Sequence, residues 1–365
     1  WLAGAGAEYT RIEPDDGWKD RVLAPLGFYA SNGFAWRDLG PDRLLARMSE
    51  RIGRRGGIIL RGARVTGLTM SKAGCTGVAV DRETFAASAV VLADGGFHGN
   101  RQMLRRFVTP HPESLALRGP DAAYGDGIRL AEAAGAKLVG MAAFYGHLLS
   151  ADSLSREGLS PFPFLDLLAT AGMIVDDSGA RFVEEGRGPH VIANALARHR
   201  NGIGLVIFDD AMWNGAGREF FCPPNPNLVQ NGGTLHRADD IPSLARKAGV
   251  PETALVRSVA TRTVGHSTLP SSIDARRAKH GAMPFGGGPY YAAPACAAIT
   301  HTMGGVAIDE HARVLDMHDH PIAGLYAAGA TSGGLEGGPD AAYLGGLVPA
   351  VVFGLLAAEH AKGAR

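Results

Sequence analysis

The C-terminal part of the sequence, residues 302–354, alternates short apolar runs with glycine pairs, and this pattern constrains the fold most strongly. One apolar run in this segment ends in GLYAAGATSGG. A later glycine pair is followed at once by an apolar, helix-like stretch. Strands, glycine turns and helices in alternation are typical of an α/β protein. A helix that begins directly after glycines exposes unpaired N–H groups and carries roughly half a positive charge at that end. The segment therefore predicts a backbone site for a phosphate group or for the electron-rich edge of a flavin ring.

The two ends of the chain share one sequence pattern, and the middle has another. Before residue 137, the pattern predicts strands at 58–60, 64–70, 76–80 and 89–93 and helices at 41–52 and 128–134. From 137 to 294, prolines and aromatic residues are more frequent, with helix-like pieces at 191–199 and 253–264. After this, we predict a hairpin from 306–309 and 314–316, a buried strand at 324–328 and a buried last helix at 347–361, too short to span a bilayer. We infer an α/β domain built from both chain ends, with an α+β lobe inserted between them.

Several short motifs occur in the order found in the fumarate reductase / succinate dehydrogenase flavoprotein family, which includes 3-ketosteroid and tricarballylate dehydrogenases. They are Arg64-Val65-Thr66, Ala93-Asp94-Gly95-Gly96-Phe97, Gly125-Asp126-Gly127, the segment 175–182 ending in Arg181-Phe182, Pro289-Tyr290-Tyr291-Ala292 and the glycine-rich C-terminal segment. The chain resembles that family over nearly its whole length. The resemblance implies an α/β fold with a glutathione-reductase-like FAD-binding domain, residues 1–140 and 295–365, and an inserted α+β cap domain, residues 141–294.

The resemblance implies FAD as the cofactor and identifies the residues expected to contact it. These are Val65, Ala93, Asp94, Gly95, Asp126, His301, Gly329, Ala330, Gly345, Gly346, Leu347 and Val348. Members of the family begin with a strand, a GxGxxG-like turn and a helix that bind the ADP pyrophosphate, and no such motif precedes Trp1 in this sequence. We therefore expect an incomplete FAD-binding domain, and weak or no binding of FAD by this chain alone.

The activity implied by the resemblance is oxidation or reduction of a C–C bond next to a carbonyl or carboxylate, with the substrate held between the cap domain and the flavin. We expect His147, Arg187, Tyr291 and Tyr343 to border that substrate. A tyrosine can serve as acid or base where its neighbours lower its pKa. Ordinary packing is an equal alternative for both tyrosines.

Residues that act on fumarate in the family are not matched in this sequence. Tyr343 stands in place of a carboxylate-clamping arginine, Thr300 in place of the first of two histidines, Pro189 in place of a proton-donating arginine, and Leu165 and Leu168 near the proton relay. The nearest arginine to the donor position, Arg187, comes two residues early. A phenol cannot replace the charged fork of a guanidinium. Fumarate is therefore disfavoured, and bulkier or less charged substrates are favoured.

Two alternative functions stay open, and a metal site is disfavoured. The chain could be a non-catalytic fragment of a FAD-binding domain, or a ketosteroid-type dehydrogenase. Histidines at 311, 318 and 320, with acidic residues at 316 and 319, could ligate a metal, but a polar turn is favoured and no metal is expected.

Partners and location are predicted from charge and cysteine use. Acidic and basic residues are equal in number, 36 each, which indicates neither nucleic acid nor a membrane surface. We expect a small-molecule substrate and an unidentified electron donor or acceptor. Cys75, Cys222 and Cys296 are widely spaced, so we expect no disulfide framework and a cytoplasmic location.

Overall fold

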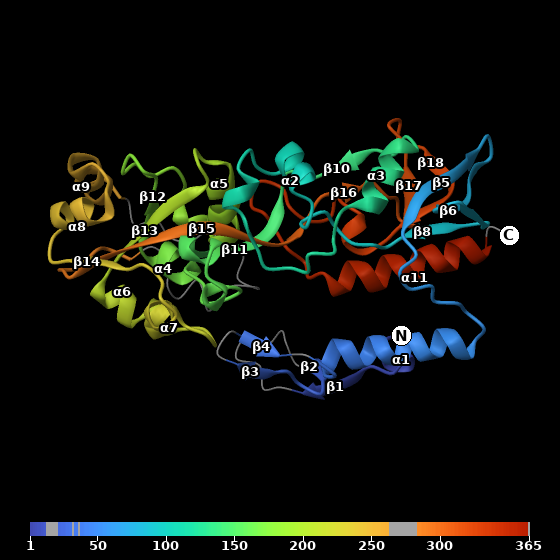
Figure 1. The fold of residues 1–365 in the computed structure, drawn as a ribbon, viewed down its shortest axis with the longest axis horizontal. Coiled ribbons are helices and arrows are strands. Elements are labelled where there is room, and N and C mark those ends of the chain that lie inside the picture. Colours follow the sequence, from blue (N-terminus) through green and yellow to red (C-terminus); the bar gives the residue numbers. More distant parts are fainter. Residues whose placement is uncertain (12–20, 31–32, 36, 263–282, 364–365) are drawn as a thin grey trace.

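The structure is a computed structural model, and it describes residues 1–11, 21–30, 33–35, 37–262 and 283–363. The molecule is elongated, with one large sheet at one end and several small sheets at the other (Figure 1). The C-terminus lies at the end with the small sheets, and the N-terminal segment lies along the side of the molecule (Figure 1). The two chain ends therefore frame a middle part that builds the large sheet.

The large sheet has six strands, and β15 (Tyr290–Thr302) is the longest. It pairs antiparallel with β11 (Phe144–Ser150), β13 (Ile203–Asp209) and β14 (His236–Ala238) and parallel with β9 (Ala116–Leu117), while β12 (Met173–Val175) pairs with β13. Successive side chains of a strand point to opposite faces. In β15, odd-numbered residues from Tyr291 to Ile299 lie in the main core, whereas Cys296 and Ala298 join Phe164 in a separate cluster.

Helices cover this sheet through their apolar faces. The main core receives α4 (Asp166–Ala171), α5 (Pro189–Arg198), α6 (Asp210–Asn214) and α7 (Pro224–Gln230). A second cluster receives α8 (Ile241–Ala248) and α9 (Glu252–Ala260), which pack against residues of β12 and β13. The sheet is thus buried from both faces, which explains why its strands are nearly continuous in apolar residues.

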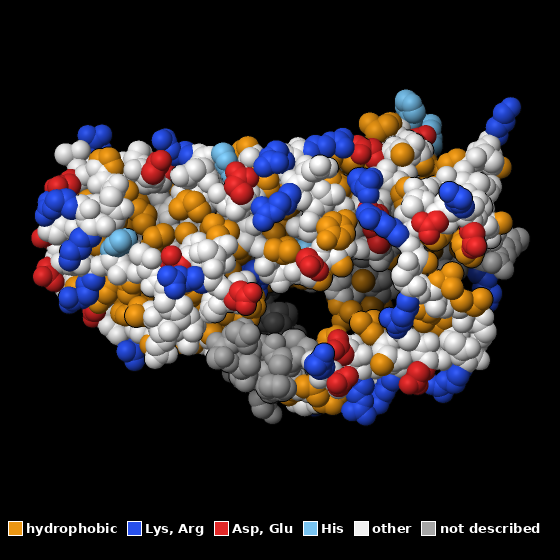
Figure 2. Space-filling model, in the orientation of Figure 1, with side chains coloured by type: hydrophobic (Ala, Val, Ile, Leu, Met, Phe, Trp, Pro, Cys, Tyr) orange, Lys and Arg blue, Asp and Glu red, His pale blue; other side chains and the backbone are white. Residues whose placement is uncertain are grey.

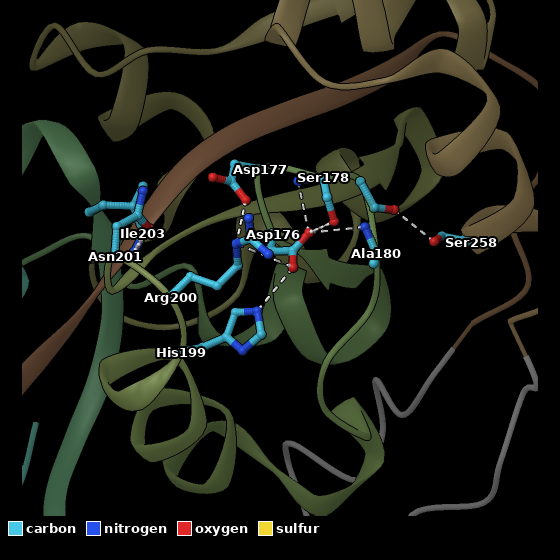
Figure 3. Close-up of polar contacts among 10 residues, drawn as sticks. Asp176, Asp177, Ser178, Ala180, His199, Arg200, Asn201, Ile203 and Ser258 are labelled. Carbon is cyan, nitrogen blue, oxygen red and sulfur yellow. Dashed lines mark hydrogen bonds and ion pairs between the residues drawn. The ribbon is translucent and has the colours of Figure 1, made fainter. Parts of the chain in front are cut away.

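A polar turn between β12 and α5 is held by hydrogen bonds to one carboxylate (Figure 3). The carboxylate of Asp176 accepts hydrogen bonds from the backbone N–H groups of Ser178 (2.9 Å) and Ala180 (3.1 Å). Its other oxygen contacts Nε2 of His199 at 3.0 Å, just beyond the end of α5. The His199 ring also stacks on Phe182, with ring centres 4.1 Å apart. The turn thereby holds the C-terminal end of α5 beside β12.

The other end of the molecule is made of small sheets and three helices. One sheet contains β5 (Val65–Ser71), β6 (Gly74–Val80) and β7 (Glu83–Ala86); another contains β17 (Arg313–Leu315), β18 (Pro321–Ala327) and β8 (Val90–Leu92); β10 (Leu138–Val139) pairs with β16 (Gly305–Val306). The helices are α2 (Arg101–Phe107), α3 (Asp126–Ala133) and α11 (Leu347–Gly363). Strands β8 and β18 are parallel. The hydroxyl of Tyr326 contacts Nδ1 of His360 at 2.9 Å, which ties α11 to β18.

The N-terminal segment forms a small unit of its own. It contains β1 (Glu8–Arg11) paired with β2 (Arg21–Ala24), β3 (Phe28–Ala30) paired with β4 (Gly33–Ala35), and α1 (Gly40–Arg54). Arg47 of α1 donates to the carbonyl of Gly6 at 2.6 Å and to Glu8 at 2.5 Å. Figure 2 shows an open gap between this segment and the middle of the molecule.

Most elements predicted for the two chain ends are confirmed. The strands predicted at 64–70, 76–80, 89–93 and 324–328 correspond to β5, β6, β8 and β18, and the helices at 41–52, 128–134, 191–199 and 347–361 correspond to α1, α3, α5 and α11. The helix predicted at 253–264 corresponds to α9, and its expected end, Val264, lies outside the described residues. Among the described residues, no helix is both long and apolar enough to cross a bilayer.

Two predictions were wrong, and one predicted element is shorter than expected. Residues 58–60 are not a strand: they follow α1 without a pairing partner, and the Ile58 side chain is 82% exposed. The predicted hairpin from 306–309 and 314–316 is present but short: Ile308 bridges Val314 antiparallel, the N–H of Asp309 donates to the carbonyl of Arg313 at 3.1 Å, and the N–H of Leu315 donates to that of Ala307 at 2.9 Å. Helix α11 is not buried, since Leu347, Val348 and Val352 are about half exposed. The predicted domain boundary after residue 294 lies inside β15, and the division into domains stays a prediction.

Candidate active site

The glycine turn after β8 is locked to two distant segments by short polar contacts. Asp94 accepts a hydrogen bond from the N–H of Gly127 at 2.8 Å, at the start of α3. The N–H of Gly95 donates to Oγ1 of Thr331 at 3.0 Å. A Cβ on Gly96 would lie 2.2 Å from Oγ1 of Thr302, so only glycine fits this crossing. The turn, α3 and the loop after β18 therefore meet as one rigid unit.

Four predicted cofactor residues line one cavity beside this turn. Val65, Ala93, Asp94 and Asp126 share it with apolar residues of β6 and β8. The Asp126 carboxylate is held by Arg64, whose Nε donates at 2.7 Å and Nη2 at 2.9 Å. This hydrogen-bonded guanidinium lowers the pKa of Asp126, so the cavity has an ionised wall at neutral pH. Their role in binding a cofactor stays a prediction.

A second cavity lies at the start of α11. It is lined by His301 together with Met303, Gly329, Ala330, Ser332, Glu336, Gly346 and Pro349. The predicted residue Gly345 has φ of +101°, a conformation that favours glycine, and a Cβ there would meet open space. Leu347 and Val348 stand at the open helix start and are about half exposed. The N–H of Gly346 donates to the Tyr343 hydroxyl at 2.9 Å and that of Val348 to the carbonyl of Gly345 at 3.3 Å. The positive end of the α11 dipole beside this cavity is the feature predicted to face the pyrimidine edge of a flavin, and that role stays a prediction.

Aromatic rings gather where β11 begins and β15 ends, beside this second cavity. Tyr145 stacks on Tyr343 with ring centres 3.9 Å apart, and the His301 ring lies 5.5 Å from Tyr145 and 5.0 Å from Tyr343. His190 of α5 lies 4.8 Å from Tyr145. Two of the four predicted catalytic residues, His147 and Tyr343, therefore meet, with Tyr145 between them.

His147 is the buried member of this cluster. Its Nδ1 lies 2.6 Å from Oδ2 of Asp166 and its Nε2 3.1 Å from the Tyr145 hydroxyl. The other Asp166 oxygen accepts from the N–H of Leu148 at 2.7 Å. Burial lowers the pKa of His147 to about 4, although Asp166 opposes this. A neutral ring that donates from Nδ1 to the carboxylate leaves Nε2 to accept the Tyr145 proton.

The remaining two predicted catalytic residues lie elsewhere. Arg187 donates to the carbonyl of Pro339 at 2.6 Å and to Asp340 at 2.8 Å, and it lines a third cavity of about 660 Å³. Tyr291 packs in the main core, where its hydroxyl donates to Asp210 at 2.9 Å. It is ten residues from His301, roughly 33 Å along a strand, and it points to the opposite face from Ala298, the partner of His147. The structure thus does not bring Tyr291 to the cluster.

Sequence reasoning missed Tyr145, Asp166 and His190. A strand at 144–150 would have placed Tyr145 and His147 on one face, because residues two apart in a strand share a side. No sequence signal joins Asp166 to His147, since their contact depends on how α4 packs against β11.

The histidine-rich segment 311–320 forms a turn around an acidic residue. Asp316 accepts from the backbone N–H groups of His318 at 2.8 Å and His320 at 2.9 Å. Within the described ranges, no group of three or more His, Cys, Asp or Glu side chains is arranged to hold a metal ion. Cys75, Cys222 and Cys296 are separate, buried thiols.

Comparison with known proteins places this chain among FAD-binding proteins. Residues 14–342 match a protein family described as FAD binding domain. The NADH:acrylate oxidoreductase of Vibrio harveyi is 30% identical over 99% of this chain and 35% of its own length. The probable fumarate reductase Ifc3 of Shewanella frigidimarina is 28% identical over 75% of this chain and 44% of its own length. The chain thus spans less than half of these two relatives.

Two solved structures share the fold. The 3-ketosteroid delta1-dehydrogenase of Sterolibacterium denitrificans matches with a TM-score of 0.66 at 23% identity, over 90% of this chain and 64% of that chain. A flavocytochrome c3 fumarate reductase in its open conformation matches with a TM-score of 0.61 at 22% identity, over 100% of this chain and 61% of that chain.

Proposed function

The chain belongs to the FAD binding domain family, and from this premise we propose that it forms part of an oxidoreductase acting on a C–C bond next to a carbonyl or carboxylate. The flavoprotein relationship predicted from the sequence is confirmed by this match, and FAD is the family's cofactor. The relatives named above act on acrylate and, as a probable assignment, on fumarate, which are both activated alkenes. An activated alkene is therefore the simplest substrate to propose for this chain.

We further infer that the two ends of the molecule correspond to the two predicted domains. The end with β5–β8, β17, β18, α3 and α11 is built from both parts of the chain and holds the two cavities with the predicted cofactor residues. The large sheet comes mainly from the middle part, with β9 (Ala116–Leu117) and the last residues of β15 added from the two ends. These facts support a glutathione-reductase-like FAD-binding domain with an inserted cap domain.

One observation carries the proposed function: the cavity at the start of α11 shares His301 with the Tyr145–Tyr343 pair. Bound FAD would supply a hydride donor or acceptor at its N5 atom. The second requirement of the reaction, a group that carries a proton to or from carbon, is met beside it. The cavity itself encloses only about 20 Å³, so it would receive an edge of the flavin ring and not the whole ring, with the proton carrier beside it.

Within this proposal, Tyr145 is the proton carrier. When its oxygen removes a proton from a substrate carbon, its own hydroxyl proton moves to Nε2 of His147, 3.1 Å away. The Asp166 carboxylate, 2.6 Å from Nδ1, stabilises the imidazolium that results. The reverse sequence delivers a proton to carbon in a reduction.

A flavin reoxidation assay tests the proposed function. The full chain is loaded with excess FAD, reduced without oxygen, and mixed with crotonate, fumarate, a ketosteroid enone or buffer while flavin absorbance is followed. We expect an activated alkene to restore the oxidised spectrum. A protein that holds FAD but is reoxidised by no alkene would support the fragment alternative and contradict the proposal; reoxidation by the enone alone would favour the ketosteroid-type alternative.

A further inference from the structure

Arg118 is placed at the candidate site by the large sheet. It follows β9, and its N–H donates to the carbonyl of Ile299 in β15 at 2.8 Å. The pairing of β11 with β15 shifts between Tyr145 and Gly146, which leaves Thr300 as the extra residue of a bulge. Nη1 of Arg118 donates to Oγ1 of this Thr300 at 2.6 Å. The guanidinium therefore contacts the residue that precedes His301, and His301 lines the cavity at the start of α11.

The orientation of this guanidinium is fixed, but part of it is left without an acceptor. Nε donates to the carbonyl of Pro161 at 3.2 Å, and the group lies over the Phe164 ring, 4.5 Å from its centre. Nη2 has no acceptor among the described residues. It is also absent from the buried, unpartnered nitrogens of that part of the chain, which belong to His98 and Arg262. Nη2 is thus accessible, and it is oriented by the contacts that hold the rest of the group.

The charge of Arg118 is only partly compensated. In the described part of the chain it forms no ion pair, whereas Arg187 is paired with Asp340 and Arg181 with Glu185. Asp166 lies near, but its two oxygens are engaged by His147 and Leu148. Burial lowers the pKa of Arg118 to about 10, so the group is still charged at neutral pH. Asp166 favours the charged guanidinium only through space, so an anionic ligand hydrogen-bonded to Nη2 would stabilise this partly buried cation further.

We propose that Arg118 is the residue that binds a carboxylate of the substrate, and hence that the substrate is an α,β-unsaturated carboxylate rather than a neutral enone. The substrate assignment rests on the proposed function; the binding of an anion does not. Arginine presents a planar fork that matches a carboxylate, and Thr300 and Pro161 hold that fork in place. The sequence comparison looked for this cation at residue 343, where a tyrosine stands, and so favoured less charged substrates. The structure supplies a cation from β9 instead.

Binding of a matched pair of ligands tests the assignment. Crotonate and its neutral isostere crotonamide are titrated calorimetrically into the FAD-loaded full chain, as wild type, Arg118→Gln, Arg118→Lys and Arg105→Gln. Arg105 is an exposed arginine paired with Glu113, and its replacement controls for the loss of one positive charge. We expect wild type to bind crotonate at least roughly tenfold more tightly than crotonamide, because hydrogen bonds to charged groups are the stronger ones.

The variants separate recognition from structure. Arg118→Gln should weaken crotonate binding by about 10- to 100-fold and change crotonamide binding by less than about twofold, with Arg118→Lys intermediate and Arg105→Gln like wild type. Equal affinity of wild type for both ligands overturns the assignment, even if Arg118→Gln does not fold. Parallel loss of both ligands in Arg118→Gln also overturns it, because a purely structural role predicts that result.

The outcome for the proposed function is read separately. Crotonate that binds through Arg118 without reoxidising reduced flavin contradicts the proposed function and leaves the anion site standing. An enone that reoxidises the flavin in a protein that does not bind crotonate contradicts the Arg118 assignment and leaves the proposed function standing.

Discussion

The two sides of the candidate site are built by opposite means. On the side of β8, β18 and α11, backbone groups of glycine turns form the surface, and side chains mostly hold the turns together. On the side of the large sheet, buried side chains form the surface, with Tyr145, His147, Asp166 and Arg118 contacting one another or their strands. A backbone surface depends on where side chains are absent, whereas a side-chain surface depends on which groups are present. The two sides should therefore respond to different substitutions.

The largest effect is expected on the side-chain surface, from Tyr145→Phe. This change keeps the ring that stacks on Tyr343 and removes the hydroxyl that contacts His147. Because the proton carrier is lost, flavin reoxidation by the substrate should slow by about 10²- to 10⁴-fold, with flavin content unchanged. Tyr326→Phe is the matched control, since it removes another hydroxyl hydrogen-bonded to a histidine, on β18. Equal rates in wild type and Tyr145→Phe would break the assignment of chemistry to this side.

Each side carries one buried histidine, and both predict the same pH dependence of stability. Burial lowers the pKa of His98, next to the glycine turn, and of His147 to about 4, from an ordinary 6.5. Below pH 6.5 both histidines become protonated in the unfolded chain, whereas in the folded chain they stay neutral until the pH approaches 4. The stabilisation is therefore complete above about pH 6.5 and is lost as pH falls towards 4, by about 3 kcal/mol for each histidine.

Chemical denaturation at a series of pH values measures this loss, and His98→Leu sharpens the comparison. Neither ring nitrogen of His98 has a well-aligned hydrogen-bond partner among the described residues, and its contact with the Pro120 backbone does not offset burial, so leucine should cost little at pH 8. The variant should lose roughly half as much stability as wild type between pH 6.5 and 4. An unchanged pH dependence in His98→Leu would show that His98 is not the titrating group on the glycine side.

On the backbone side, one added methyl group should destabilise the fold. A Cβ on Gly304 would lie 2.4 Å from both the backbone N and Cα of Met141, neither of which can move alone. Gly304→Ala should lower the free energy of unfolding by about 1–3 kcal/mol, measured by denaturant titration. Gly354→Ala is the control, because a Cβ in that part of α11 meets nothing within 4 Å. That control should stabilise by roughly 0.5–1 kcal/mol, and the comparison fails if the two variants behave alike.

The smallest effect is expected where the two sides meet, from Tyr343→Phe. The Tyr343 hydroxyl accepts a hydrogen bond from the N–H of Gly346 at 2.9 Å, beside the start of α11. Loss of one such bond, worth about 1 kcal/mol, should loosen the loop and raise the Kd for FAD about fivefold. Quenching of flavin fluorescence on titration measures this constant. An unchanged Kd would indicate that the loop does not depend on this contact.

The glycine side was largely predictable because its information is local. Gly95, Gly329 and Gly345 have positive φ, a backbone conformation that favours glycine, and this local preference can be read from the sequence. The strands β5, β6, β8 and β18 and helix α11 were predicted for the same reason. The exposure of α11 was not, because an apolar run does not show which neighbours cover it.

Composition and motif order alone determined that the chain has the α/β pattern of a flavoprotein and where its glycine turns lie. Only the tertiary structure brought together Tyr145, Asp166 and Arg118, from β11, α4 and the segment after β9, and removed Tyr291 to the opposite face of the sheet. Pairing across β15 sets these contacts, and a one-residue bulge at Thr300 changes which side chains meet. The register between strands that are distant in sequence forms only when the sheet folds. The folded sheet therefore determines which polar side chains meet on this side of the site.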